Sequence, residues 1–467
     1  HRGPDSNGKF IQKENGISFS HNRLSILDLS SEGNQPMKST CERFLILFNG
    51  EIYNHLILRE EHGKNFKWQG SSDTETLLFC IVKFGLLPTL QKVRGMYSFI
   101  LYDLEEKKVY LVRDISGEKP LYFGILDKKF FFSSEIKSLN NRKLFDKELS
   151  TIEIRNYFKF GYTLNSIFKK ISKLAPGHYL EFDIKKFKLS SPQNYWKKEN
   201  KQYSKKCLKE NSIELENLLK KSVKEQMISD VPLGAFLSGG IDSSLVASLA
   251  QSFSNKSIKT FSIGFDDKNF SETRHAEKVA KILNTDHYSL ELNHKNIHET
   301  IIQLVENMDE PFADGSIIPT YMVSKLSKKH VKVVLTGDGA DELFGGYSHY
   351  NRYNFLSKIQ KFFPLPLRNS IVNLFLDLLP INIRGRKTLE LFGKDINKLD
   401  FNNASLFGYK MRKNLFKDSS ELKKVISKEK IISTDLIRSI TFEDYSNYLP
   451  EDILVKIDRA SMASSLE

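Results

Sequence analysis

The hydrophobic and polar positions follow two different periods in the two halves of the chain. Up to about residue 193, short runs of β-branched and aromatic residues are bounded by Gly, Asn and Asp, which is typical of strands joined by turns. Strands are expected at 17–20, 44–49, 97–102, 108–113, 121–125 and 130–134, and helices at 74–84 and 152–160. This half is predicted to be an α+β fold, with antiparallel sheets in a sandwich and a few helices.

From about residue 212, helical and strand patterns alternate. We expect helices at 213–228, 245–253, 271–283, 296–308 and 320–328, and strands at 234–237, 258–265, 287–292 and 331–335. Ser271 is the expected N-cap of its helix, and 352–443 is expected to be mainly helical. Repeated strand–helix units predict an α/β domain with a parallel sheet, whose ligands bind at the carboxyl ends of the strands.

The stretch 184–211 separates the two patterns. It is polar and rich in lysine and contains a proline, as interdomain linkers often are. Tyr195 and Trp196 are large apolar groups within it and are expected to anchor it. We therefore predict two domains, 1–200 and 201–467.

Composition narrows the class of protein. The chain has 467 residues, 40% of them hydrophobic and 27% charged, as in globular proteins, and no apolar run reaches the roughly 18 residues of a membrane span. Cys41, Cys80 and Cys207 are far apart, which argues against disulfides or a zinc site and for a reducing cytoplasm. Cys41 and Cys80 are expected to be small buried residues.

The net charge is +13, but the lysines are spread along the whole sequence. We interpret this as a general lysine bias, and expect neither a nucleic-acid nor a membrane partner. The chain begins at His1 without methionine and stops inside an apparently structured pattern at Glu467. We expect it to be a fragment that lacks both natural ends.

A glycine-rich stretch after an expected strand indicates a phosphate site. Residues 231–245 read VPLGAFLSGGIDSSL, so a strand, a glycine turn and a helix start follow one another. Backbone N–H groups and the helix dipole converge there on one point. The hydroxyls of Ser238, Ser243 and Ser244 add donors, and Asp242 lies where Mg²⁺ would bind. The alternative, a flexible turn, applies to the tripeptide SGG alone.

The complete SGGIDSS pattern resembles the pyrophosphate loop of the ATP pyrophosphatase family. Those enzymes cleave ATP to AMP and pyrophosphate while they adenylate a substrate. Two further segments lie at the ends of expected strands. Ile263 and Gly264 offer backbone groups for adenine, and 336–347 (TGDGADELFGGY) combines glycines with three acids. Such crowded carboxylates favour a cation, although an ordinary acidic loop is the alternative.

Several short motifs of the first half have simple explanations when taken singly. Arg23 could form a surface ion pair, Asn49 and Gly50 a hairpin turn, and Asp73 a helix cap. In their order and spacing, however, these motifs resemble the class II glutamine amidotransferase family. The motifs are 1–5, 23–27, 49–54, 71–75, 95–99, 113–114 and 117–122.

This resemblance implies a four-layer αββα sandwich of the N-terminal-nucleophile type, with an N-terminal cysteine as nucleophile. Arg23 would bind the α-carboxylate of glutamine, Asp73 its α-ammonium with Glu51 nearby, and Asn49 and Gly50 would form the oxyanion hole. The full glutamine set is Arg23, Leu24, Ser25, Ile26, Leu27, Asn49, Gly50, Glu51 and Asp73. The nucleophile would lie upstream of His1, so we expect this chain to keep the glutamine pocket without hydrolysing glutamine.

Both halves together resemble the glutamine-hydrolysing asparagine synthetase family. In the second half the resemblance also rests on 261–265, 309–314, 318–321 and 456–463. It implies that aspartate attacks the α-phosphate of ATP, that β-aspartyl-AMP and pyrophosphate form, and that tunnelled ammonia displaces AMP. The implied ATP set is Leu237, Ser238, Gly239, Gly240, Ile241, Asp242, Ser243, Ile263, Thr336 and Gly337.

The same resemblance assigns further roles. Asp242 and Asp341 would hold Mg²⁺, and Asp338 stands where the family has a glutamate that assists the intermediate. Lys456 and Arg459 are both candidates for the α-phosphate, and the sequence does not choose between them. The expected partners are small molecules (glutamine, aspartate, ATP), with a possible homodimer.

The acceptor is the least predictable part. The loop 309–318 is expected to line its pocket, without showing that it selects aspartate. A related amidotransferase could amidate another carboxylate, such as a sugar acid in surface polysaccharide synthesis. Weaker alternatives are a β-lactam synthetase-like cyclase, a non-catalytic glutamine or nucleotide binder, and a pyrophosphatase that modifies nucleic acid.

Overall fold

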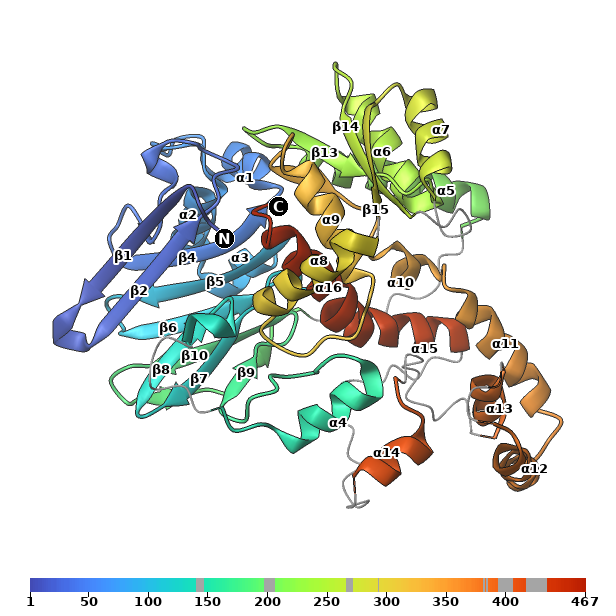
Figure 1. Cartoon of the computed structure of the whole chain (residues 1–467). Helices are drawn as coiled ribbons and strands as arrows, with labels where there is room; N and C mark the ends of the chain where they lie inside the picture. Colours follow the sequence, from blue (N-terminus) through green and yellow to red (C-terminus); the bar gives the residue numbers. More distant parts are fainter. Residues whose placement is uncertain are drawn as a thin grey trace. The chain divides into compact units, whose positions relative to one another are not determined.

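The chain folds into two compact units in a computed structural model (Figure 1). The structure describes residues 1–139, 147–196, 206–265, 272–292, 294–380, 383, 385–393, 406–416 and 435–467. The first unit consists of His1–Glu153, Asn165–Gly337 and Leu454–Glu467, and the second of Ile154–Leu164 and Asp338–Ile453. Each unit is described separately below.

A seven-stranded antiparallel sheet is the centre of the N-terminal half of the first unit. Its order is β11-β10-β6-β5-β4-β3, with β12 also paired to β10. The strands are β3 (Met37–Lys38), β4 (Phe44–Ile52), β5 (Gly95–Asp103), β6 (Lys108–Arg113), β10 (His178–Asp183), β11 (Lys188–Leu189) and β12 (Gln193–Asn194). Two smaller sheets accompany it: β1 (Ser6–Gln12) with β2 (Ile17–Arg23), and β8 (Lys129–Ser133) with β7 (Tyr122–Leu126) and β9 (Ile171–Lys173).

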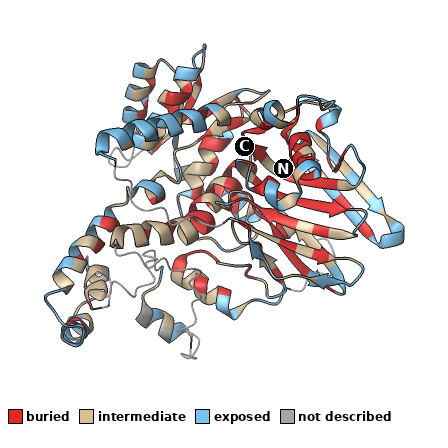
Figure 2. Ribbon diagram, turned by 180° about the vertical axis from the view of Figure 1, so that it is seen from behind, coloured by how far each residue is buried: buried red, intermediate tan, exposed pale blue. Residues whose placement is uncertain are grey.

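Both faces of the large sheet are apolar, because successive side chains along each strand point alternately into two cores. On one face Ile46, Phe48 and Phe99 pack against helix α2 (Asp73–Phe84). On the other, Leu45 and Leu47 belong to a core with residues of the smaller sheets, among them Phe19 and Phe123. The result is a helix layer, a sheet and a second sheet layer, and Figure 2 shows these strands with many buried residues. The other helical segments of this half are α1 (His55–His62), α3 (Leu86–Leu90), η1 (Lys13–Asn15), η2 (Ser31–Gly33), η3 (Ile136–Leu139) and α4 (Thr151–Phe160), which continues into the second unit.

The second half of the first unit is built on a four-stranded parallel sheet of order β15-β14-β13-β16. Its strands are β13 (Leu233–Phe236), β14 (Lys259–Phe265), β15 (Asp286–Leu292) and β16 (Val333–Leu335). Its helices are α5 (Leu208–Gln226), α6 (Ile241–Phe253), α7 (Thr273–Leu283), α8 (His294–Asn307), α9 (Ile317–Ser327) and α16 (Leu454–Met462). The chain runs from β13 outward to β14 and β15 and returns to the other side of β13 with β16. The strand order therefore reverses between β13 and β16, which is the position where α/β sheets bind ligands.

The second unit is helical in the residues that the structure describes. It contains α10 (Ala340–Phe344), α11 (Ser348–Gln360), α12 (Leu365–Leu378), α13 (Arg386–Phe392), α14 (Tyr409–Leu415), α15 (Leu436–Glu443) and the π-helical segment η6 (Asp444–Ile453). Its core joins Tyr350, Tyr353 and Leu356 of α11 to Ile440 of α15. No helix in the described ranges is both long and apolar enough to cross a bilayer.

Most expected elements are confirmed, with shifted ends, and three predictions were wrong. Helix α6 begins at Ile241 rather than Leu245, because Gly240 already serves as its N-cap. The expected linker contains β11 and β12 of the large sheet, and α5 begins at Leu208; residues 197–205 lie outside the described ranges, as does Ser271. Tyr195 does anchor this segment, since its hydroxyl donates to Arg113 O at 2.8 Å. Cys41 is exposed and only Cys80 is buried.

Candidate functional site

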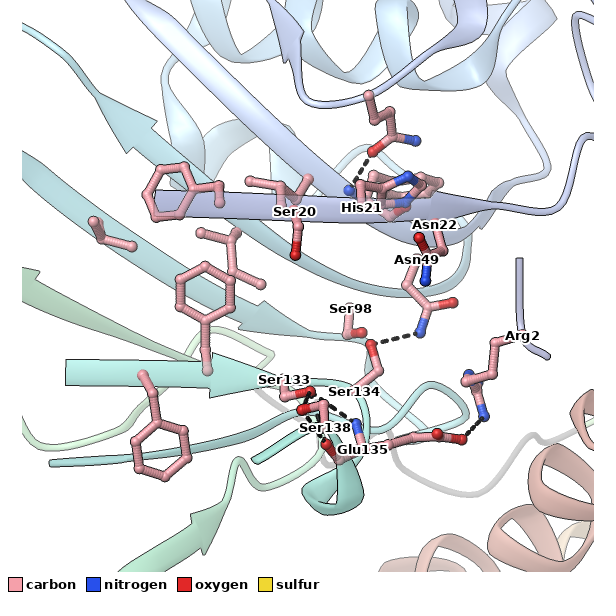
Figure 3. Close-up of a pocket in the computed structure, with 18 of the residues that line it drawn as sticks. Arg2, Ser20, His21, Asn22, Asn49, Ser98, Ser133, Ser134, Glu135 and Ser138 are labelled. Atoms are coloured by element: carbon pink, nitrogen blue, oxygen red, sulfur yellow. Dashed lines mark hydrogen bonds and ion pairs between the residues drawn. The ribbon is translucent and has the colours of Figure 1, made fainter. Parts of the chain in front are cut away.

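A cavity of about 880 Å³ lies in the N-terminal half, beside the ends of β2 and β4 (Figure 3). Its walls include most of the residues predicted to bind glutamine: Arg23, Leu24, Ile26, Leu27, Asn49, Gly50, Glu51 and Asp73. Ser25 is not among the lining residues, and its backbone N–H donates to Asp5 at 2.8 Å. Motifs that are up to 50 residues apart in sequence thus meet at one cavity. They do so because β2 and β4 end there and α2 begins there.

Arg23 is 7% exposed, so the surface ion pair is excluded. Its guanidinium donates to Ser30 O at 3.0 Å, Leu27 O at 3.0 Å, Asn34 Oδ1 at 3.3 Å and Asp28 O. These bonds hold the loop 27–34 in place. Arg23 therefore also has a structural role that the sequence did not predict.

Asp73 and Glu51 are buried carboxylates in the wall of the cavity. Asp73 Oδ2 accepts from Ile52 N and Oδ1 from Thr74 N, both at 2.8 Å, while Ser72 is the N-cap of α2. Burial raises the pKa of Asp73. Burial, then the neighbouring carboxylates of Glu467 and Asp73, raise the pKa of Glu51 well above its usual range, and Glu51 Oε1 has no hydrogen-bond partner. The nearby Lys119 ammonium offsets part of this negative charge and lowers the pKa of Glu51 to some extent, and a ligand ammonium would relieve more of it.

Asn49 and Gly50 lie inside β4, where they pair with Ser98 and Tyr97 of β5. The hairpin turn is therefore excluded. Gly50 has φ +143°, and a Cβ there would collide with Met96 O. Asn49 Nδ2 donates to Ser134 Oγ at 3.3 Å across the cavity (Figure 3).

Sequence reasoning missed other residues of the wall. His21 donates from Nε2 to Phe48 O at 3.0 Å, its Nδ1 has no partner, and burial lowers its pKa to about 4. Arg2, Ser134 and Glu135 also line the cavity. The strand predicted to end at Ser20 in fact ends at Arg23. Because the alternation of inward and outward side chains in ISFSHNR continues through His21, a prediction that extended the strand to Arg23 would have included His21.

The predicted phosphate loop connects β13 to α6 in the second half. Gly240 is the N-cap of α6, and Ser238 and Gly240 are exposed. Ser238 Oγ and Ser243 Oγ lie 2.9 Å apart, whereas Ser244 Oγ is buried without a partner. Gly239 has φ +84°, and a Cβ there would lie 2.7 Å from Ala276 N. The loop thus presents backbone N–H groups at a helix N-terminus, at the reversal of strand order.

Gly337 approaches this loop closely. A Cβ at Gly337 would lie 2.9 Å from Ser243 N and 3.1 Å from Asp242 Cβ. Because β16 pairs with β13, Thr336 and Gly337 follow the strand beside the loop. Ile263 is on β14, the neighbour of β13 on the other side, and packs in the core with Phe261. The structure therefore brings the predicted ATP residues to one edge of the parallel sheet.

The third loop is divided between the two units. Gly337 belongs to the first unit, and Asp338 and Asp341 belong to the second. Within the second unit, Glu342 is 1% exposed and accepts from the Tyr347 hydroxyl at 2.7 Å. The pairing of Asp242 with Asp341, and the role of Asp338, stay predictions.

Lys456 and Arg459 are one turn apart on α16 and have different environments. Lys456 Nζ lies 3.6 Å from Asp314 Oδ2, a loose pair. Arg459 is fully surrounded: its guanidinium contacts Glu135 Oε1 at 3.2 Å, the Tyr122 hydroxyl at 3.3 Å and Asp309 Oδ2 at 3.4 Å.

The acids at the start of the loop 309–318 face the N-terminal half. Asp309 accepts from the backbone N–H groups of Ile136 and Lys137, both at 2.9 Å. Glu310 accepts from the Tyr122 hydroxyl at 2.8 Å and from Ile167 N at 2.6 Å. These two side chains are thus occupied by contacts between the halves, which leaves Asp314 as the acid of this loop nearest to Lys456.

Comparison with known proteins identifies both halves. Residues 1–196 match the family model described as a glutamine amidotransferase domain, and residues 214–467 match the asparagine synthase model. A glutamine-hydrolyzing asparagine synthetase of Bacillus subtilis is 34% identical over 100% of this chain and 73% of the relative. A putative glutamine-hydrolyzing asparagine synthetase of Methanocaldococcus jannaschii is 35% identical over 99% of this chain and 93% of the relative.

Among solved structures, a glutamine phosphoribosylpyrophosphate amidotransferase from B. subtilis matches 59% of the chain at 15% identity with a TM-score of 0.30, too low to support an argument. The sequence matches, in contrast, cover both halves in one continuous alignment with each relative. The chain belongs to the family of glutamine-hydrolysing asparagine synthetases.

Proposed function

We propose that this protein makes L-asparagine from L-aspartate, ATP and ammonia derived from glutamine, and releases AMP and pyrophosphate. The observation that carries the proposal is the joint match of both halves to relatives of that name. The geometry supports it, because each half has a separate site of suitable chemistry. For the N-terminal half we propose the αββα fold of the glutaminases, of which one helix layer and the two sheet layers are described above. For the C-terminal half we propose the fold of the ATP pyrophosphatases, with a boundary near residue 200.

In the glutaminase half, Asp73 and Glu51 bind the α-ammonium of glutamine. Both are buried beside one another and burial raises the pKa of each, so a ligand cation would add to Lys119 in favouring their charged forms. Arg23 attracts the α-carboxylate, and Asn49 Nδ2 with Gly50 N–H stabilises the tetrahedral oxyanion. Gly50 is required because any side chain would collide with β5.

In the synthetase half, the N-terminus of α6 and the 237–243 loop bind the phosphates of ATP. Gly239 and Gly337 let two backbone segments approach where a Cβ would collide, so a polyphosphate fits this cradle. Asp242 in the first turn of α6 fits a Mg²⁺ that is also held by phosphate oxygens, since Mg²⁺ needs only one or two protein carboxylates there. A bound Mg²⁺ would neutralise pyrophosphate as it leaves, and Asp341 is its second proposed ligand.

The reaction is tested by measuring AMP and pyrophosphate with ATP, Mg²⁺, ammonium and a panel of carboxylic acids that includes aspartate and sugar acids. Release that depends on aspartate, with asparagine as product, is the expected result. Release with another acid would keep the adenylation chemistry and replace the acceptor. Absence of release with every acid, from folded protein that binds ATP, would contradict the proposal.

Two further proposals concern the state of the protein in the cell. Cys41, Cys80 and Cys207 are all free thiols, which supports a reducing cytoplasm. A homodimer is proposed from the family resemblance, and light scattering of the purified chain tests it.

A further inference from the structure

The segment 23–28 of the glutaminase half takes part in two sets of contacts. Its side chains contribute to the wall of the cavity proposed to bind glutamine, through Arg23, Leu24, Ile26 and Leu27. Its backbone is bonded to the synthetase half, where Asp230 and Lys332 stand just before β13 and β16. Because these two strands pair in parallel, both residues lie at the amino edge of the sheet, opposite to the phosphate loop.

Asp230 contacts the segment twice. Its backbone N–H donates to Ile26 O at 3.1 Å, and its Oδ2 accepts from the backbone N–H of Asp28 at 2.7 Å. A bond from a backbone N–H to a carboxylate is charge-assisted and stronger than a bond between neutral groups. The two contacts bind residues two positions apart, so they fix the course of the backbone between them.

Asp28 is a position where the backbone needs such contacts. Its φ is +56°, a left-handed conformation that is uncommon for residues other than glycine. Such conformations persist where the surrounding contacts determine them. Arg23 donates to Asp28 O, and Asp28 Oδ2 accepts from Ser71 N at 2.8 Å. Asp230 adds the contact to the Asp28 N–H, so this residue is held by both halves.

Lys332 reaches the same segment through Asp5. Lys332 Nζ lies 3.0 Å from Asp5 Oδ2, which also accepts from Ser25 N at 2.8 Å, and the Asp5 N–H donates to Arg23 O at 3.0 Å. Both members of this ion pair are partly exposed, so it contributes little by itself. The Lys332 N–H also donates to Pro232 O at 3.0 Å, which joins the two points of attachment.

The loop that Asp230 contacts also determines the direction of the Arg23 guanidinium. The carbonyl groups that accept from this guanidinium include those of Leu27, Asp28 and Ser30. A shift of the loop would therefore move the guanidinium as well. Arg23 is the group proposed to attract the α-carboxylate of glutamine, so the position of the loop affects the affinity for glutamine.

We propose that Asp230 is a positioning residue of the glutamine site, which orients Arg23 from the synthetase half by fixing the backbone of Ile26 and Asp28. Asp230 is not among the residues that line the cavity, so it acts through the loop and not on glutamine itself. The inference rests on the proposed function, because it takes this cavity as the glutamine site. It adds that the glutaminase half needs the synthetase half for its full affinity.

The test uses substitutions that separate the hydrogen bond of Asp230 from its charge. Asp230→Ala removes the acceptor and should raise the Kd for glutamine about 5-fold, the effect of one net hydrogen bond. Asp230→Asn keeps an acceptor oxygen in the same place and should stay within about twofold of the wild type. Calorimetric titration with L-glutamine measures both. Ammonium-driven AMP release should stay within about twofold in both variants, because the phosphate loop is at the opposite edge of the sheet.

Glu225→Gln is the matched control. Glu225 is another acid of the synthetase half that contacts the glutaminase half, through Arg94 Nη2 at 2.8 Å, away from the segment 23–28. Its Kd for glutamine should stay within about twofold of the wild-type value. If Asp230→Ala does not fold, Asp230→Glu replaces it, because the longer side chain moves the carboxylate away from the Asp28 N–H.

Amide hydrogen exchange of peptides that cover residues 24–34 gives a second readout. Exchange should be faster in Asp230→Ala than in the wild type, because the loop loses a contact that holds it. It should be unchanged in Asp230→Asn and in Glu225→Gln. Unchanged exchange in Asp230→Ala would show that the loop is held without Asp230, and would overturn the inference.

The binding results distinguish the inference from the proposed function. If the wild type binds glutamine and Asp230→Ala binds it equally well, the inference is overturned and the function stands. Equal weakening by Asp230→Ala and Asp230→Asn would also overturn it, because the position of the acceptor would then not matter. A parallel loss of ammonium-driven synthesis in Asp230→Ala would make Asp230 a general support of the fold. A wild type that binds no glutamine would overturn both the inference and the glutamine site.

Discussion

The glutamine pocket and the phosphate loop are built in opposite ways. In the pocket, Arg23 and Asp73 are buried and already bonded to protein: Arg23 donates to the loop 27–34 and Asp73 accepts from two backbone N–H groups. Glu51 Oε1 and His21 Nδ1 are buried there without a hydrogen-bond partner among the described residues. In the phosphate loop, Ser238 and Gly240 are exposed, and the hydroxyls of Ser238 and Ser243 contact each other. The proposed glutamine pocket is thus organised largely by bonds within the protein, whereas the proposed phosphate loop is an open end of a helix.

This difference predicts different consequences of mutation. Changes to Arg23 or Asp73 should reduce the stability of the fold together with glutamine binding, because the same bonds serve both. Glu51 is the exception in the pocket, because its Oε1 has no hydrogen-bond partner. Changes to the exposed polar side chains of the loop should reduce ATP chemistry and leave stability nearly intact. The following predictions test that contrast, beginning with the largest effect.

Asp242→Asn should lower pyrophosphate release by about 100-fold or more, because it removes the charge proposed to hold Mg²⁺ against the phosphates. The midpoint of thermal unfolding should stay the same, since Asp242 is at the open end of α6. The measurement is ammonium-driven AMP and pyrophosphate release. Asp286→Asn is the control, an exposed aspartate where β15 begins, at the opposite edge of the sheet. Equal losses in the two variants would remove Asp242 from the metal site.

Arg23→Ala should raise the Kd for glutamine by about 30-fold, as expected for loss of a charged hydrogen bond. It should also cost about 2 kcal/mol of stability, because four acceptors of the loop 27–34 lose their donor. Ammonium-driven synthesis should stay within about twofold. Calorimetry with glutamine and urea unfolding measure the two effects. Arg23→Lys keeps the charge and should recover part of the affinity but not the stability; unchanged glutamine affinity in Arg23→Ala would make its role purely structural.

Gly239→Ala and Gly240→Ala form a neighbouring pair in the phosphate loop. Gly239 has φ +84° and its Cβ would lie 2.7 Å from Ala276 N, whereas a Cβ at Gly240 meets only Ser238 Oγ at 3.3 Å. We expect Gly239→Ala to lower ammonium-driven kcat/KM for ATP by about 10-fold, from strain of about 1–3 kcal/mol, and Gly240→Ala to have a smaller effect. The reverse order would contradict the observed loop geometry.

Much of this arrangement was predictable from sequence, because glycine loops and strand ends have local signatures. The SGGIDSS loop and the order of strands and helices were found in that way. The burial of Arg23 was not, since three of its four partners are backbone carbonyls, which leave no pattern of residue types. The attachment of Asp309 and Glu310 to the glutaminase half was missed for a similar reason: their donors are the N–H groups of Ile136, Lys137 and Ile167.

Glu51→Gln should have the smallest effect of these variants. It tests the contrast between pocket and loop at a residue of the pocket. Burial raises the pKa of Glu51 in the folded state, so the folded protein holds a proton that the unfolded chain releases. The stability contributed by this group is therefore present at low pH and decreases as pH rises from the ordinary glutamate pKa towards the raised one. Glutamine does not titrate, so the variant should match the wild type near pH 5 and be more stable by about 1 kcal/mol near pH 8.

Urea unfolding at the two pH values measures this difference, with Glu14→Gln, an exposed glutamate on η1, as control. The same variant should bind glutamine more weakly at pH 8, because the α-ammonium loses a carboxylate. A gain in stability that accompanies a loss of affinity is the behaviour expected of a residue kept for binding despite its cost to the fold. Equal destabilisation at both pH values would show instead that the Glu51 carboxylate is satisfied by its surroundings, and the pocket would then require no cation to complete it.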